Sequence, residues 1–139
     1  MLCCNRCGYG YRSAKSYEAI KRFHTQDLRL YADLRCAKDR AGNGNTNIDF
    51  ALCAGIDSEI IAVAGASVAF GDILEVGVDV KKEWRGQGLA GLLVRNLTVE
   101  LLERDMIPFY SVSVTNLASQ AVAITSGYMP FWTDSYGVR

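Results

Sequence analysis

The chain has 139 residues, and its 15 basic and 15 acidic side chains give a formal net charge of zero. Half of the residues are hydrophobic and 22% are charged, a composition typical of a folded globular domain. A neutral chain lacks the basic surplus with which nucleic-acid-binding proteins meet phosphates, and the longest apolar run, Ile60 to Phe70, is too short to span a membrane. The first residues lack the apolar core of a signal peptide. We therefore expect one soluble cytoplasmic domain over 1–139 that binds neither nucleic acid nor membranes.

The segment 1–47 is predicted to be a variable N-terminal part with helical character. Apolar residues recur at helical spacing from Ser16 to Ala37, which predicts one broken helix or two short ones. Lys38 to Asn47 is polar and contains two glycines, which predicts a loop. The segment Cys3 to Tyr11 is a candidate for an additional strand.

The segment 48–139 is predicted to form the sheet and the core that binds a ligand. Runs of apolar or alternating residues indicate five strands in this part of the chain. The expected strands are Ile48–Cys53, Glu59–Val68, Ile73–Val80, Phe109–Val114 and Met129–Tyr136.

Two helices are predicted between these strands. A leucine-rich stripe with 3.6-residue spacing indicates a long helix over Leu89–Arg104. Asn116 is a good N-cap for a shorter helix that ends near Ser126, and Gly127 follows where a left-handed C-terminal cap is favoured. The expected packing face of this second helix consists of Leu117, Ala121, Val122 and Ile124.

Five cysteines are present, an odd number that favours reduced thiols in a chain without an export signal. Cys4 and Cys7 have the spacing of a zinc-ligand pair, but a closed site needs four ligands and no second close pair follows. A zinc site formed by Cys4, Cys7, Cys36 and Cys53 is therefore kept as an alternative, but we expect that the protein binds no metal. The only histidine, His24, falls in a predicted helix and is expected to be structural.

A glycine-rich loop joins the strand Ile73–Val80 to the leucine helix, with the sequence Arg85-Gly86-Gln87-Gly88-Leu89-Ala90-Gly91. Strand, helix and strand from Ile73 to Val114 form a βαβ unit, whose two strands are expected to be parallel. Glycines let the backbone approach a ligand closely, and the start of a helix presents unpaired amides at the positive end of its dipole. The loop therefore predicts a phosphate or pyrophosphate pocket, with Arg85 as an additional charge at its rim.

The pattern Gly86-x-Gly88-x-x-Gly91 also matches the fingerprint of dinucleotide-binding proteins. Two features argue against that interpretation. Five residues separate Val80 from Gly86, and no acidic residue stands at the end of the following strand, where a ribose contact is expected. A dinucleotide-binding oxidoreductase is therefore the less favoured hypothesis.

The stretch from Val78 to Ala90 reads Val-Asp-Val-Lys-Lys-Glu-Trp-Arg-Gly-Gln-Gly-Leu-Ala, and Asn116-Leu-Ala-Ser and Ser126-Gly-Tyr follow it. In these strings the chain resembles the GCN5-related N-acetyltransferase (GNAT) superfamily over its C-terminal half, Leu74 to Tyr136. The resemblance implies an α/β (α+β) fold with a mixed, mostly antiparallel sheet, a parallel βαβ cofactor unit and flanking helices. It also implies acetyl-CoA as co-substrate and direct transfer of the acetyl group to an amine in a ternary complex.

The resemblance implies where coenzyme A would bind. The backbone amides of the loop would hold its pyrophosphate, and the two strands of the βαβ unit would splay apart to admit the pantetheine arm. That arm would lie along Val78, Asp79 and Val80 and pair with the main chain of the two valines, while Asn116 and, less strongly, Ser119 would contact it. The loop residues concerned are Arg85, Gly86, Gln87, Gly88, Leu89 and Ala90.

For catalysis, Glu75 is the candidate general base and Asp79 the second choice, with a backbone amide near Val78 as the expected oxyanion donor. Many family members carry a tyrosine seven residues after the asparagine, as the acid that protonates the leaving thiolate, but this chain has Ala123 there. The sequence leaves open whether Tyr110, Tyr128, Tyr136 or a water molecule replaces it. A non-catalytic acyl-CoA-binding or sensor module is therefore an alternative to an enzyme. The acceptor is expected to be a small-molecule or peptide amine, and a homodimer that completes the sheet is possible.

Overall fold

The computed structural model describes residues 2–4, 29–32, 48–56 and 59–135, and within these ranges seven strands form one sheet in the order β2-β3-β4-β5-β6-β1-β7. The strands are β1 (Leu2–Cys4), β2 (Arg29–Ala32), β3 (Phe50–Ile56), β4 (Glu59–Phe70), β5 (Ile73–Val80), β6 (Ile107–Tyr110) and β7 (Tyr128–Pro130). A short 3-10 helix, η1 (Lys82–Trp84), and two α-helices, α3 (Leu89–Glu103) and α4 (Leu117–Thr125), complete the described elements.

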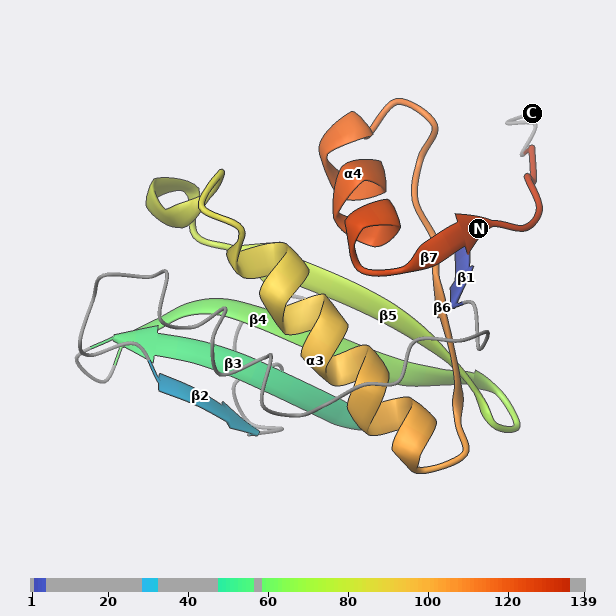
Figure 1. Cartoon of the computed structure of the whole chain (residues 1–139), viewed down its shortest axis with the longest axis horizontal. Helices are drawn as coiled ribbons and strands as arrows, with labels where there is room; N and C mark the ends of the chain where they lie inside the picture. Colours follow the sequence, from blue (N-terminus) through green and yellow to red (C-terminus); the bar gives the residue numbers. More distant parts are fainter. Residues whose placement is uncertain (1, 5–28, 33–47, 57–58, 136–139) are drawn as a thin grey trace.

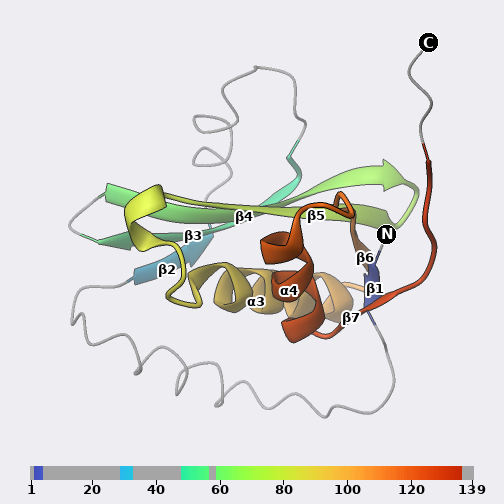
Figure 2. The same ribbon diagram turned by 90° about the horizontal axis from the view of Figure 1, so that it is seen from above.

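The sheet is mixed, and β5 and β6 form its parallel pair. The other neighbouring strands within the described ranges are antiparallel. The helix α3 connects the parallel pair, so the predicted βαβ unit and the predicted fold class are confirmed. Figure 2 shows that α3 and α4 lie on the same face of the sheet.

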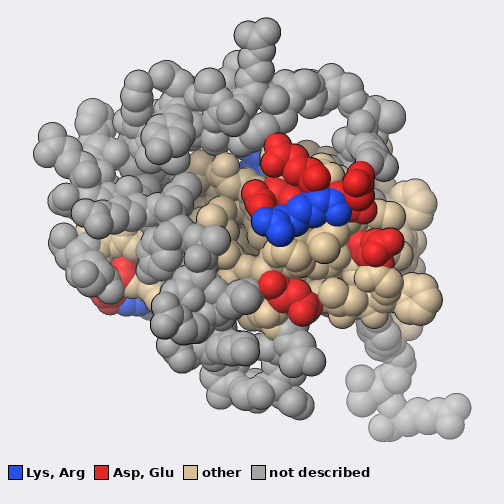
Figure 3. Space-filling view, turned by 90° about the horizontal axis from the view of Figure 1, so that it is seen from below, with Lys and Arg blue, Asp and Glu red and all other residues tan. Residues whose placement is uncertain are grey.

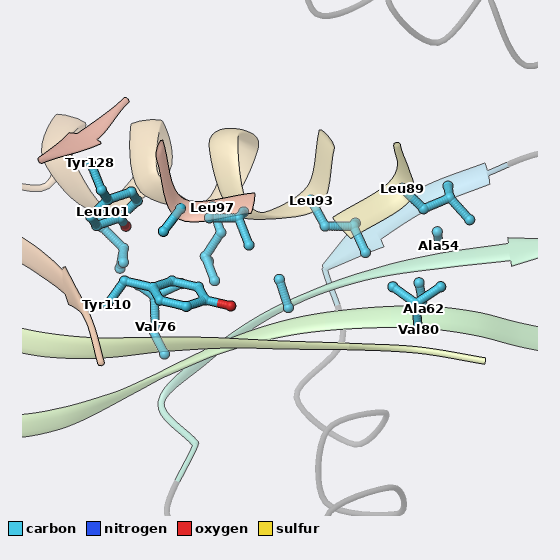
Figure 4. Packing of buried hydrophobic residues seen from close by; sticks show 14 of the residues in the cluster. Ala54, Ala62, Val76, Val80, Leu89, Leu93, Leu97, Leu101, Tyr110 and Tyr128 are labelled. Atoms are coloured by element: carbon cyan, nitrogen blue, oxygen red, sulfur yellow. The ribbon is translucent and has the colours of Figure 1, made fainter. Parts of the chain in front are cut away.

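The main core lies between α3 and the central strands. The helix supplies large side chains, while the facing positions of β4 are mostly alanines, so large and small residues interdigitate (Figure 4). The predicted leucine stripe is confirmed, because its central members are buried. The core residues include Leu89, Leu93, Leu97 and Leu101 of α3, Ala54, Ala62, Ala64 and Ala66 of the strands, and Leu74, Val76 and Val80 of β5.

The helix α4 buries only part of the predicted face, since Val122 is partly buried against the core while other predicted members face outward. Leu117 is 73% exposed and Ile124 is 56% exposed, whereas Ala123 is completely buried. This helix meets α3 at Gly91, where an added Cβ would lie 3.8 Å from the Thr125 hydroxyl oxygen. A close approach between helices favours small side chains, and this places the alanine inward and the larger residues outward.

The predicted helix over Ser16–Ala37 is wrong where the structure describes that segment, because Arg29–Ala32 is the strand β2, paired antiparallel with β3. The helical spacing of the apolar residues did not reveal that an edge of the sheet needed a partner. At the N-terminus, β1 pairs with both β6 and β7, which confirms the candidate strand Cys3–Tyr11 at Cys3 and Cys4. Residues 5–11 of that candidate lie outside the described residues. The predicted loop at Lys38–Asn47 and His24 lie outside the described residues.

Two predicted strands begin and end elsewhere. The strand expected at Phe109–Val114 is Ile107–Tyr110, and the one expected at Met129–Tyr136 is Tyr128–Pro130. Both end where β1 stops supplying a partner, since Leu2 is paired with Tyr110 on one side and with Pro130 on the other. The β3 and β4 strands also run further than expected, to Ile56 and Phe70.

Within the described ranges no helix is both long and apolar enough to cross a membrane. Figure 3 shows the face of the molecule seen from below, where acidic side chains gather round a basic one and much of the visible described surface is uncharged. The described residues visible on that face form no broad basic surface of the kind that binds a phosphate backbone.

Candidate functional site

The site is built on a fork between β5 and β6. The two strands are paired only from Ile73 with Ile107 to Glu75 with Phe109. Beyond Glu75 they separate, and Figure 1 shows β6 turning away from β5 towards α4. The predicted splaying of the parallel strands is therefore present, with Glu75 at its neck.

Beyond the neck, one edge of β5 presents main-chain groups to the open side of the fork. The Lys81 amide donates to the Ile61 carbonyl on β4 at 2.9 Å, whereas the Ile107 amide on β6 donates to the Asp72 carbonyl at 2.8 Å. Main-chain groups alternate in direction along a strand, so the odd residues of β5 point to β4 and the even ones to β6. The N–H and C=O groups of Val76 and Val78 thus face the opening, where an added extended chain would pair with them.

The loop after β5 reaches the start of α3 through two glycines in the left-handed region. Gly86 has φ 76° and Gly88 has φ 83°, and a Cβ added at either would meet nothing within 4 Å. Gly88 is the N-cap and provides no side-chain cap, and the Leu92 amide makes the first helical bond, to Gly88 O at 3.0 Å. The amides of the first turn of α3 are therefore not satisfied by the helix itself, which is the arrangement that binds anions.

Arg85 fixes the loop to the end of β5. Its Nε donates to the Val80 carbonyl at 2.9 Å, and its Nη2 lies 3.7 Å from Asp79 Oδ1. The Val80 oxygen thus already has a partner, and of that residue's main-chain groups only the amide is left for a strand-like ligand. The side chains of both Arg85 and Asp79 are more than half exposed, so this ion pair adds little to stability.

A pocket of about 490 Å³ opens at the fork. It reaches from the cleft between β5 and β6 onto the sheet face opposite α3, because its walls include alternate residues of both β4 and β5. Its floor includes the cross-strand pair Gly65 and Gly77. The space above Gly77 is open, whereas the Ile48 side chain covers Gly65, where an added Cβ would lie 3.2 Å from Ile48 Cγ2. The other walls are Ile48, Val63, Ala66, Ser67, Glu75, Val76, Val78, Asp79, Tyr110, Ser111 and Ser119.

Two hydrogen bonds organise the polar side chains of the pocket. At the neck, the Ser111 hydroxyl donates to Glu75 Oε1, which links the two arms of the fork. Deeper in the cleft, the hydroxyls of Tyr110 and Ser119 lie 2.9 Å apart. Tyr110 is only 3% exposed, and its ring packs edge-on against Tyr128 with centroids 5.8 Å apart.

The sequence-predicted site residues divide into three groups. Glu75, Val78, Asp79 and Ser119 line the pocket. A second group lies at the end of β5 and the start of α3: Val80, Arg85, Gly86, Gln87, Gly88, Leu89 and Ala90. Leu89 is buried in the core, so only its backbone is available to a ligand. The third position, Asn116, is confirmed as the N-cap of α4, where its Oδ1 accepts a bond from the Ser119 amide at 3.1 Å.

Sequence reasoning missed the residues that shape the far side of the pocket. Ser67, Ser111, Gly65 and Gly77 carried no motif, and they meet only because β4, β5 and β6 are neighbours. The alternative zinc site of four cysteines falls partly outside the described residues, because Cys7 and Cys36 are among the residues that are not described. Cys53 is fully buried in β3, and the described part of the chain holds no group of three or more potential metal ligands.

A comparison with family sequence profiles matches residues 47–131 of this 139-residue chain to GNAT acetyltransferase, more than half of its length. The chain belongs to the GNAT acetyltransferase family. This membership decides against the dinucleotide-binding oxidoreductase. A comparison with curated proteins gives no match for this GNAT chain.

Solved structures share its fold. One is a GCN5-related N-acetyltransferase-like protein from Streptococcus suis 89/1591, with a TM-score of 0.68, 15% identity, and coverage of 91% of this chain and 56% of the other. A second is an aminoglycoside N-acetyltransferase in complex with CoA, with a TM-score of 0.60, 15% identity, and coverage of 81% and 94%. A third is an aminoglycoside antibiotic 6'-N-acetyltransferase from Acinetobacter baumannii, with a TM-score of 0.55, 16% identity, and coverage of 81% and 97%. The GNAT chain thus spans little more than half the length of the first protein.

Proposed function

We propose that this chain is an acetyl-CoA-dependent N-acyltransferase that moves an acetyl group directly to an amine in a ternary complex. The observation that carries the proposal is the open main-chain edge of β5, which lies between the uncapped start of α3 and a pocket with room for a second molecule. Acetyl-CoA is the co-substrate used by the GNAT family.

Coenzyme A would be bound mainly through backbone groups. The amides from Gly86 to Ala90 bind the pyrophosphate, which the helix dipole also attracts. The pantetheine arm then runs back along β5 and pairs with Val80 N–H and with the Val78 carbonyl, which leaves the Val78 amide for the thioester oxygen. This direction leads from the loop towards the neck of the fork, so the thioester reaches the pocket beside Glu75.

The acceptor amine would enter from the sheet face opposite α3, above Gly77, where the structure leaves open space. Only a neutral amine attacks a thioester carbonyl, and Glu75 is the carboxylate at the neck that takes the proton as the N–C bond forms. The Val78 amide, which points into the fork, donates to the oxygen that becomes negative. Holding both substrates in one cleft supplies much of the acceleration by positioning.

Two measurements test this proposal. Titration calorimetry with CoA, and with NAD as the comparison ligand, measures binding; we expect CoA to bind and NAD to release no heat. Release of free thiol from acetyl-CoA across a panel of small-molecule amines, including aminoglycosides, and peptide amines then measures turnover. Binding of CoA without turnover on any amine would favour a non-catalytic acyl-CoA-binding module instead.

The variant Glu75→Gln tests the base on any amine that is acetylated. Glutamine keeps the shape and can still accept the bond from Ser111, but it takes up no proton. We expect kcat to fall by about 100-fold, the lower end of general-base contributions, with KM for acetyl-CoA unchanged. The matched control is Ser67→Ala, which alters a pocket wall on β4 with no role assigned in the chemistry. An unchanged kcat in Glu75→Gln would remove Glu75 as the base.

A further inference from the structure

The departing thiolate of an acyl transfer is a basic anion and leaves more easily with a proton. Four residues with hydroxyl groups line the pocket: Ser67, Tyr110, Ser111 and Ser119. Ser67 belongs to β4, which lies on the far side of β5 from the fork, so the other three are the candidates at the fork itself. Ser111 commits its proton to Glu75, so it has none to give to sulfur. The remaining pair, Tyr110 and Ser119, lies at the inner side of the cleft.

We infer that Tyr110 is the acid that protonates the leaving thiolate, with Ser119 as the residue that orients its hydroxyl. The inference rests on the proposed function. A phenol is a stronger acid than an aliphatic alcohol, so of the two hydroxyls the tyrosine is the better donor to sulfur. When the Ser119 hydroxyl donates to Tyr110 Oη across their 2.9 Å contact, the phenol proton is left to point into the cleft.

Tyr128 provides the contrast that makes this assignment specific. The Thr98 hydroxyl donates to the Val94 carbonyl at 2.7 Å, so the Tyr128 hydroxyl, 2.7 Å from Thr98 Oγ1, must be the donor of that pair. Its proton is therefore committed inside the core, and Tyr128 is not a pocket residue. Figure 4 shows the Tyr110 hydroxyl pointing away from Tyr128 and towards the Val80 end of β5. Tyr136 lies outside the described residues.

Tyr110 also lies where β6 begins to separate from β5. It follows directly after Phe109, the last residue of β6 paired with β5, so its side chain is at the point where the cleft opens. The edge-on contact with the Tyr128 ring holds its own ring at a fixed angle, with 62° between the planes. A nearly buried ring that lines the pocket and is held by its neighbours can act as a rigid proton donor.

The proton and electron balance of the step is complete. The amine nitrogen forms the N–C bond and gives its proton to Glu75; the C–S bond then breaks and its electron pair passes to sulfur. The Tyr110 proton moves to sulfur, the Ser119 proton moves to the phenolate, and solvent in the open pocket restores the Ser119 proton. The Glu75 proton returns to solvent, so one amine and one thioester give one amide and one thiol.

The test uses CoA itself, so it does not depend on knowing the acceptor. A donor aimed at sulfur stabilises the bound thiolate and lowers the pKa of the bound thiol. We expect that pKa to be about one unit lower in the wild-type complex than in Tyr110→Phe, a tenfold difference in acidity. The measurement is the ultraviolet absorbance of the thiolate against pH, with desulfo-CoA bound to the same protein as the blank.

Tyr128→Phe is the matched control, because it removes a hydroxyl from the adjoining ring without touching the pocket; we expect a wild-type thiol pKa. Ser119→Ala is expected to raise the thiol pKa part of the way, and Ser119→Thr to restore it; these two variants carry the test if Tyr110→Phe does not fold. CoA binding with the same thiol pKa in wild type, Tyr110→Phe and Ser119→Ala would overturn the role of Tyr110 and leave the proposed function standing. Failure of the wild-type chain to bind CoA would overturn both.

Discussion

The two α-helices in the described part of the chain, α3 and α4, begin in opposite ways. At the start of α4, Asn116 satisfies the Ser119 amide with its own side chain. At the start of α3, Gly88 has no side chain to offer, and two left-handed glycines hold the preceding loop open. Both helices face the same physical problem, which is a first turn of unpaired N–H groups.

The presence or absence of a side-chain cap distinguishes the start of α4, which is structural, from the start of α3, which is available to a ligand. A capped start is complete without a ligand, and the chain supplies the cap at the cost of one ordered side chain. An uncapped start beside an open strand edge is completed by an anion from outside. The same backbone chemistry thus gives stability at Asn116 and recognition at Gly88.

The largest expected effect comes from giving the open loop a side chain. Gly86→Ala places a Cβ on a residue with φ 76°, where L-residues are strained, in the loop whose amides are proposed to bind the pyrophosphate. We expect CoA affinity to fall by about 30-fold, or about 2 kcal/mol, measured by titration calorimetry.

Gly71→Ala is the matched control for this variant. Gly71 has φ 55° and equally open surroundings, but it lies in the turn between β4 and β5. The backbone strain should cost a similar free energy of unfolding in both variants, and only Gly86→Ala should weaken CoA binding. Equal CoA affinities in the two variants would show that α3 is not the binding end.

A smaller effect is expected from removing the cap of α4. Asn116→Ala leaves the Ser119 amide without its acceptor, and we expect the free energy of unfolding to fall by about 1 kcal/mol in urea denaturation. Asn116→Asp keeps the acceptor and should restore stability. If Asn116→Asp nevertheless weakens CoA binding, the amide NH₂ contributes to the ligand as well as the oxygen to the helix. A stability unchanged in Asn116→Ala would contradict the structural role.

The smallest expected effect is that of salt, which should weaken CoA binding at the start of α3 but leave the stability contributed by the cap of α4 unchanged. Binding of a diphosphate at α3 is electrostatic, so raising NaCl from about 0.05 M to about 0.5 M should weaken CoA binding by roughly threefold. The cap at α4 is a short neutral hydrogen bond, so the loss of stability in Asn116→Ala should be the same at both salt concentrations. A CoA affinity independent of salt would argue that the pyrophosphate is not held at the helix start.

Features that depend on neighbouring residues along the chain could be predicted before the structure was known. The leucine spacing of α3, the glycine loop, the cap at Asn116 and the parallel βαβ unit were all predictable, because periodicity, caps and crossover handedness are local rules. The family resemblance followed from the same continuous strings, and it was confirmed over 47–131.

The pairing of strands at the sheet edges and the choice of buried helix face could be seen only in the folded structure. Arg29–Ala32 became a strand because β3 offered an edge, and Ala123 turned inward because α4 approaches α3 closely at Gly91. The Ser111 contact with Glu75 and the Tyr110 contact with Ser119 arise only after β6 has separated from β5. Such pairings are chosen by competition among distant segments for burial and hydrogen bonds, which no local pattern in the chain records.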